Sequence, residues 1–301
     1  MELWIAASVA AALFQTVRFM LQKHLSGLSL SAAGATFARF VYSAPLALLC
    51  LAVYLSLAPN GIAPSDAAFW LFGIVGGVAQ IVATVCTVLL FKRRNFAVGI
   101  TFIKVEVLLT ALIGIVVLGD AVSGLGMAAI IVGVAGVLVL SGPPDTGTGG
   151  FLRRVVSPSA ALGLTAGALF GVSAVSYRGA SLEIASTDPF LRALVTLAAV
   201  TTMQMMAMAV WLRFREVGEI RRVIHAWRGA VWIGLTSMAG SFCWFTAFTL
   251  QNAAYVKAVG QIELIFAIVG SVVFFRERIS AREWLGMALL SASILVLVLV
   301  L

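Results

Sequence analysis

The chain has 301 residues, of which 62% are hydrophobic and only 11% are charged, with a mean hydropathy of +1.10. A soluble domain is nearer half apolar and a quarter charged, so the composition excludes a soluble globular protein and indicates an integral membrane protein. The net charge of +8 does not indicate nucleic-acid binding, because the basic residues cluster in short loops between apolar segments, as in cytoplasmic membrane loops.

Ten apolar segments are long enough to cross a bilayer, which takes about 20 residues. The expected spans are residues 3–21, 31–57, 67–91, 96–118, 122–140, 158–178, 187–212, 229–250, 253–275 and 280–301. The first span lacks the basic start and the small-residue cleavage pattern of a signal peptide, so we expect a retained helix. The sequence therefore predicts an all-α membrane protein with ten transmembrane helices.

One connection differs from the other short loops. Residues 141–157 are rich in glycine and proline, which predicts a flexible linker on the cytoplasmic side. This linker divides the chain into a first five-helix repeat at residues 1–140 and a second five-helix repeat at residues 158–301.

The two halves share polar residues at a fixed offset of 157 positions. The matched pairs are Asn95 with Asn252, Glu106 with Glu263, and Asp120 with Glu277. Because each repeat has an odd number of spans, the second repeat should be inverted relative to the first. This is the architecture of many transporters, in which the repeats enclose a central cavity near the bilayer midplane.

Lysine and arginine gather in the loops after the odd-numbered helices, and the positive-inside rule places such loops in the cytoplasm. One example is the run at 92–94. Another is segment 213–228, which we expect to lie along the membrane surface. Both termini should then lie on the outer, periplasmic side of a cell inner (plasma) membrane.

These features together resemble the drug/metabolite transporter superfamily, specifically its ten-helix EamA-type branch. The resemblance rests on the duplicated five-helix units, on Arg39-Phe40 in the second helix, and on the similar ends of the halves, LGDAVSGLG at 118–126 and FFRERISAREWLG at 274–286. Many members carry a proline partway along helices four and nine, where this chain has Lys104-Val105-Glu106 and Gln261-Ile262-Glu263. The resemblance implies a ten-helix bundle that moves small metabolites or drugs, often as an exporter.

Glu106 and Glu263 are the main candidates for a site, because each lies about ten residues, or roughly 15 Å, into its helix. A carboxylate there could bind a substrate amine, or take up and release a proton. Alternatively, Lys104, Lys257 or a backbone group neutralises each glutamate and the charges only hold helices together. The lysines could also bind a substrate carboxylate, although Lys257 is close enough to a helix end to reach the interface.

Further polar and aromatic residues complete the candidate pathway. They are Arg39, Gln80, Trp244, Asn252 and Gln261. Aromatic rings with nearby hydroxyl groups could form a cavity wall for apolar side chains. Arg18 lies near the end of the first helix, so we expect its side chain to reach the interface instead.

Nothing in the sequence indicates catalysis. The two histidines, His24 and His225, fall in predicted loops, and the three cysteines lie in apolar runs without the spacing of metal ligands. No hydrolase, metalloprotease or phosphate-loop motif is present. We therefore expect neither an enzyme nor a bound cofactor or metal.

The sequence thus predicts a secondary transporter that exports small metabolites such as amino acids across the inner membrane by alternating access. Its partners should be the small-molecule substrate, membrane lipid and, if transport is coupled, protons. Alternatives are a flippase of lipids or lipid-linked sugars with the same fold, and a facilitative uniporter or channel.

Overall fold

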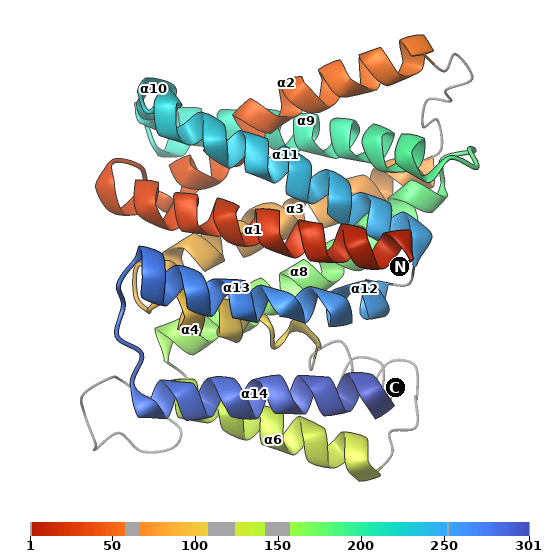
Figure 1. Ribbon diagram of the computed structural model, residues 1–301. Helices are drawn as coiled ribbons and strands as arrows, with labels where there is room; N and C mark the ends of the chain where they lie inside the picture. The colour runs from red at the N-terminus through yellow and green to blue at the C-terminus, as the bar shows by residue number, and fades with distance from the viewer. Residues whose placement is uncertain (1, 58–66, 108–123, 142–156, 252, 301) are drawn as a thin grey trace.

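The computed structural model describes residues 2–57, 67–107, 124–141, 157–251 and 253–300, and every regular element in these ranges is helical. The helices form a bundle in which most axes run in similar directions (Figure 1). In chain order they are α1 (Leu3–Leu28), α2 (Ala32–Leu57), α3 (Ala67–Phe91), α4 (Phe96–Ile103), α6 (Gly124–Ser141), α8 (Pro158–Leu182), α9 (Pro189–Arg215), α10 (Glu219–His225), α11 (Trp227–Leu250), α12 (Ala253–Val259), the 3₁₀ turn η2 (Gly260–Ile262), α13 (Glu263–Val269), the π-helical turn η3 (Gly270–Phe274) and α14 (Ala281–Val300).

Seven helical segments within the described ranges are long and apolar enough to cross a membrane. They are α1, α2, α3, α8, α9, α11 and the combined segment Tyr255–Phe274. The shorter α6 and the final α14 fall on two further expected spans. The all-helical membrane fold is therefore confirmed, whereas the count of ten spans and the inverted repeat stay predictions.

The fourth expected span, residues 96–118, is only partly described by the structure. The helix α4 ends at Ile103, and residues 108–118 lie outside the described ranges. The proposed linker at 141–157 also falls almost wholly outside them. Its role as a boundary between halves is untested.

Local sequence signals explain where two of the long helices begin. At the start of α8, the Ser157 hydroxyl accepts a hydrogen bond from the Ala160 N–H, and Pro158 occupies the first turn. At the start of α9, the Asp188 carboxylate accepts from the Phe190 N–H. Such caps satisfy backbone donors that the first turn of a helix leaves without intrahelical partners.

Three helix pairs have the most extensive contacts: α3 with α8, α1 with α11, and α6 with α14. The pair of α6 and α14 lies along one side of the bundle, while α2, α9 and α11 gather on the opposite side (Figure 1). Glycines allow some of these close approaches. A Cβ added at Gly76 of α3 would lie 2.9 Å from the Ser176 Cβ of α8, and one at Gly163 would lie 2.6 Å from the Phe102 Cβ.

The outer surface of the bundle is strongly apolar. Leu49, Val53 and Leu71 are each at least half exposed, and Trp232 is similarly open. A soluble protein rarely exposes so many large apolar side chains, whereas a bilayer solvates them. The helix α1 begins, and α14 finishes, at the same end of the bundle (Figure 1).

Candidate substrate site

Two helices are interrupted at the positions where the sequence places its intramembrane charges. After α4 ends at Ile103, Lys104 and Val105 form a turn, and the Val105 N–H bonds to Phe102 O at 3.4 Å in an i→i−3 pattern. In the second half, the 3₁₀ turn η2 separates α12 from α13, and Glu263 directly follows it. Many members of the family that the chain resembles carry a proline here. This chain has none at either position, yet both helices are interrupted.

The two buried glutamates are bound crosswise by the two lysines. Lys104 Nζ lies 2.5 Å from Glu263 Oε2, and both side chains are almost completely buried. Lys257 Nζ lies 3.4 Å from Glu106 Oε2, with 15% of the lysine side chain exposed. Each ion pair therefore joins a residue of the first half to a residue of the second half, and the four charges balance.

The Lys104–Glu263 pair continues into a short polar chain. Gln15 of α1 donates from Nε2 to Glu263 Oε2 at 2.9 Å, and its Oε1 accepts from the indole Nε1 of Trp244 at 3.0 Å. Glu263 is thus held by an ammonium and an amide at once.

Aromatic rings surround the second lysine. The Lys257 ammonium lies 5.0 Å from the Trp244 ring centroid and 6.0 Å from those of Phe170 and Phe248. These distances suit cation–π attraction, which adds to the ion pair with Glu106. Of the alternatives left open for Lys257, the structure shows its ammonium at the ion pair with Glu106 rather than at the interface.

Arg39 lies deep in the bundle and bonds to hydroxyl groups from two other helices. Its Nε donates to Ser237 Oγ at 2.9 Å, and its Nη2 to Ser241 Oγ at 3.3 Å, both on α11. Its Nη1 donates to Thr84 Oγ1 on α3 at 3.2 Å. Only 3% of the residue is exposed.

Arg18 is buried as well, with 2% of its surface exposed, so the expectation that it reaches the interface is wrong. Its Nη1 donates to Gln22 Oε1 at 3.3 Å, and Gln22 Nε2 donates to the carbonyl of Ala35 at 2.9 Å. Packing decided the outcome: the face of α1 that carries Arg18 is turned toward α2 and the bundle interior.

Gln80 belongs to a neighbouring polar network. Its Oε1 accepts hydrogen bonds of 3.0 Å from both the Tyr177 hydroxyl and Gln204 Nε2. Gln204 Nε2 also lies 3.0 Å from the carbonyl of Gly77. This network joins α3, α8 and α9 and includes neither ion pair.

The remaining predicted residues are placed differently. Gln261 donates from Nε2 to the carbonyl of Lys257 at 3.0 Å, while its Oε1 is buried without a hydrogen-bond partner among the described residues. Asn252 lies outside the described residues.

At the end of the bundle where α1 finishes, one carboxylate joins several elements. Glu277 pairs with Lys23 of α1, accepts a hydrogen bond from Ser271, and accepts from the Phe96 N–H at 2.7 Å. Asn95 Nδ2 donates to Arg278 O at 3.0 Å nearby. We refer to Lys23, Glu277 and the Phe96 N–H as the end cluster.

The opposite end has contacts of its own between helices. The Tyr54 hydroxyl at the end of α2 bonds to the Asp188 carboxylate before α9. Arg178 of α8 donates to the carbonyl of Phe248 and to that of Gln251. Both ends of the bundle are therefore tied by polar contacts in this structure.

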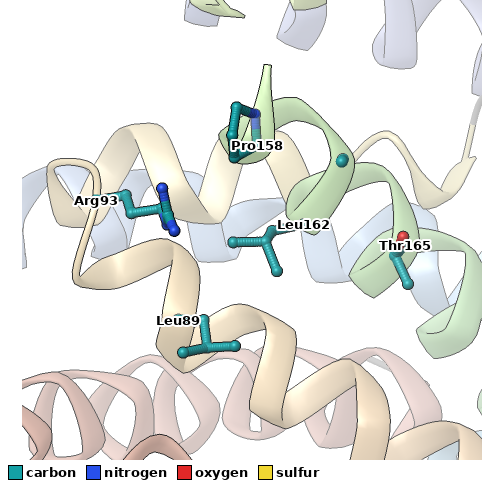
Figure 2. Close-up of a pocket in the computed structure, with 6 residues that line it drawn as sticks. Leu89, Arg93, Pro158, Leu162 and Thr165 are labelled. Atoms are coloured by element: carbon teal, nitrogen blue, oxygen red, sulfur yellow. The ribbon is translucent and has the colours of Figure 1, made fainter. Parts of the chain in front are cut away.

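A shallow pocket of about 350 Å³ lies at the side of the bundle, between the end of α3 and the start of α8. Leu89, Leu162 and Thr165 line it, with Arg93 at one edge and Pro158 at another (Figure 2). It includes none of the predicted site residues. Within the described ranges, no three His, Cys, Asp or Glu side chains gather as a metal site would require.

Sequence reasoning placed Arg18 wrongly and missed several other residues of the polar interior. These are Gln15, Gln22, Tyr177, Gln204 and Ser237. Gln15, Arg18 and Gln22 follow the i, i+3, i+7 spacing of one helix face, so a polar stripe in the first span was a usable signal.

Comparison with known proteins supports the family resemblance. Residues 157–299 match the model of the EamA-like transporter family, which is part of the drug/metabolite transporter superfamily. No curated protein matches the chain. A solved structure titled "Crystal structure of protein" superimposes on this chain with a TM-score of 0.59 and 15% sequence identity. The match covers 97% of this chain and 95% of the chain in that structure, and it shows a likeness of fold alone.

Proposed function

We propose that the protein is a membrane transporter of the drug/metabolite type that exports small zwitterionic metabolites, such as amino acids, across the inner membrane by alternating access. The match of residues 157–299 to the EamA-like transporter family supports the transporter class. The observation that carries this proposal is the pair of crossed ion pairs, Lys104 with Glu263 and Lys257 with Glu106.

Crossed ion pairs suit a zwitterion for an electrostatic reason. Removing one partner from a buried pair leaves an uncompensated charge and costs several kcal/mol. A molecule with one ammonium and one carboxylate can enter such a pair without leaving either charge alone. Its ammonium would face Glu263 while its carboxylate faces Lys104, so the total charge in the site stays constant.

Several features support an inverted repeat around this site. At the offset of 157, the turn at Lys104-Val105 corresponds to Gln261-Ile262, where η2 interrupts the second helix. The contact of α3 with α8 has its counterpart in that of α11 with α1, because these helices exchange places under the same offset. Interrupted helices near the midplane are typical of transporter sites, since they free backbone groups and charges to face a ligand.

The polar contacts at the two ends support alternating access. The end cluster of Lys23 and Glu277 would close the cytoplasmic end, and the Tyr54–Asp188 contact would close the periplasmic end. In alternating access each set opens while the other stays shut. The exposed arginines of segment 213–228 agree with a cytoplasmic assignment of the first end.

The decisive experiment is uptake into proteoliposomes of a panel of labelled amino acids, organic acids and lysolipids, with and without a pH gradient. We expect saturable transport of at least one amino acid, and strong loss of it in Glu263→Gln but not in the exposed control Glu183→Gln. If the transport that remains in Glu263→Gln no longer depends on the pH gradient, whereas that of the unaltered protein does, proton coupling would be assigned to that carboxylate. A saturable signal for lysolipids alone would reject the proposal in favour of a flippase.

A further inference from the structure

We infer that Arg18 and Arg39 form a subsite that binds the carboxylate group of the transported molecule. This inference rests on the proposed function and adds a substrate class to it: molecules that carry a free carboxylate, rather than amines or neutral compounds. It starts from the charge balance of the bundle interior.

Positive charge exceeds negative charge in the interior of the described structure. The cations are Arg18, Arg39, Lys104 and Lys257, and the carboxylates are Glu106 and Glu263. The two other buried carboxylates are at helix ends: Glu219 accepts from the Ser31 N–H, and Glu283 accepts from the Ser280 N–H. Counted over the described residues, the interior therefore carries an excess of two positive charges, which correspond to the two arginines.

A buried charge normally has a counter-charge, because desolvation of an isolated ion is very unfavourable. Arg39 contacts hydroxyl groups of Thr84, Ser237 and Ser241, and Arg18 contacts the amide of Gln22. Hydroxyl and amide groups accept hydrogen bonds but do not neutralise a guanidinium. An anionic ligand would supply the missing charge, and a transporter meets such a ligand as its substrate.

Both arginines also keep hydrogen-bond capacity. A guanidinium has five N–H donors in a fork that matches the two oxygens of a carboxylate. Within the described residues, Arg18 donates to Gln22 alone, and Arg39 donates to three hydroxyls. Gln22, which accepts from Arg18, donates to the carbonyl of Ala35, one turn before Arg39 on α2. The two arginines therefore lie where α1 meets α2, and a shared oxyanion would stabilise both.

The position of Arg18 connects this subsite to the crossed ion pairs. Gln15 lies three residues before Arg18 and donates to Glu263, so both residues lie on the same face of α1. A zwitterion whose ammonium faces Glu263 and whose carboxylate faces Lys104 would therefore have Arg18, on the neighbouring turn of α1, as a further partner for that carboxylate.

Thermal unfolding of the purified full chain in detergent tests the inference. Acetate, succinate, L-leucine, L-leucinamide and inorganic phosphate would be titrated at constant ionic strength in sodium methanesulfonate. We expect acetate, succinate or L-leucine to raise Tm saturably in the unaltered protein, whereas L-leucinamide does not. The apparent Kd should weaken about tenfold or more in Arg39→Gln and in Arg18→Gln, as expected for loss of a charge-assisted hydrogen bond.

Arg93→Gln is the matched control, because it removes an arginine that lies at the side pocket rather than in the interior. Arg39→Lys keeps the charge and should retain part of the response, so it remains informative if Arg39→Gln does not fold. Arg18→Gln provides an independent route to the same answer.

The alternative outcomes are distinct. No stabilisation by any carboxylate, an equal effect of L-leucinamide, or an unchanged response in both glutamine variants would overturn the inference. Stabilisation by phosphate alone would overturn the assignment to carboxylates. Binding is measured without a membrane gradient, so it is independent of transport. Carboxylate binding without transport would reject the proposed function and leave the subsite standing. Amino-acid transport that is unaffected by Arg18→Gln or Arg39→Gln would reject the subsite and leave the proposed function standing.

Discussion

Lys104 and Glu263 are separated by 159 residues in sequence, yet the Lys104 ammonium lies 2.5 Å from the Glu263 carboxylate inside the bundle. This contact fastens the end of α4 to the start of α13. It has a weaker counterpart in the 3.4 Å contact of Lys257 with Glu106. The following predictions test what these contacts and their surroundings do.

Replacing either partner of the closer ion pair should destabilise the protein strongly. Lys104→Met or Glu263→Met leaves one buried charge uncompensated, and we expect a loss of about 3–5 kcal/mol for each. The double variant Lys104→Met/Glu263→Met removes both charges and should recover much of that loss. The order of Tm values in detergent provides the measurement, and a double variant as unstable as the sum of the singles would contradict the ion pair.

Breaking the second ion pair should have a smaller effect. The Lys257 side chain is 15% exposed, and its ammonium lies 3.4 Å from Glu106 and 5.0 Å from the Trp244 ring. This pair is therefore longer and less buried than that of Lys104 with Glu263. We expect Lys257→Met to cost about 1–3 kcal/mol, less than Lys104→Met in the same assay. The exposed Lys92→Met serves as a control for loss of a lysine, and it should leave Tm nearly unchanged.

A methyl group at Gly167 should disturb the interruption after α4. The added Cβ would lie 2.8 Å from the carbonyl oxygen of Ile103, a backbone atom that cannot rotate away. We expect Gly167→Ala to lower stability by about 1–3 kcal/mol, the usual cost of overpacking. The matched control is Gly27→Ala in α1, where nothing lies within 4 Å and the higher helix propensity of alanine should be neutral or slightly favourable.

Neutralising Glu277 should loosen the end cluster. In Glu277→Gln the ion pair with Lys23 is lost, and the hydrogen bond from the Phe96 N–H no longer goes to a charged acceptor. We expect faster amide hydrogen exchange in residues 92–104, at least several-fold, while segments at the opposite end keep their rates. Lys92→Gln changes an exposed charge in the same loop, and an equal increase there would argue against a specific role for Glu277.

Most helix boundaries could be predicted from the sequence, because apolar runs, turn residues and helix caps are local signals. The third expected span, residues 67–91, coincides with α3, and the last begins one residue before α14. The interruptions at Lys104 and Gly260 could not be predicted, since the apolar run continues across both.

The charged residues of the site could be predicted from the sequence, but the way in which they pair could not. The spacing of Glu106 and Glu263 identified two intramembrane carboxylates, and both lysines were candidates to neutralise them. Which lysine meets which glutamate depends on how the halves pack. Arg18 was misjudged because the expected first span ended at residue 21, whereas α1 continues to Leu28. Arg18 therefore lies well inside the helix, where it is buried and its partner Gln22 contacts α2.

The crossed ion pairs also have a consequence for how the chain is made. Lys104 and Glu106 are synthesised 159 and 151 residues before Glu263 and Lys257, their respective ion-pair partners. At about 5–20 residues per second, the interval is roughly 10–30 seconds. During that time the nascent first half holds its two charges near the translocation machinery without those partners. Assembly of this protein is therefore completed late, when the ninth expected span emerges, and the two halves are best synthesised together rather than one without the other.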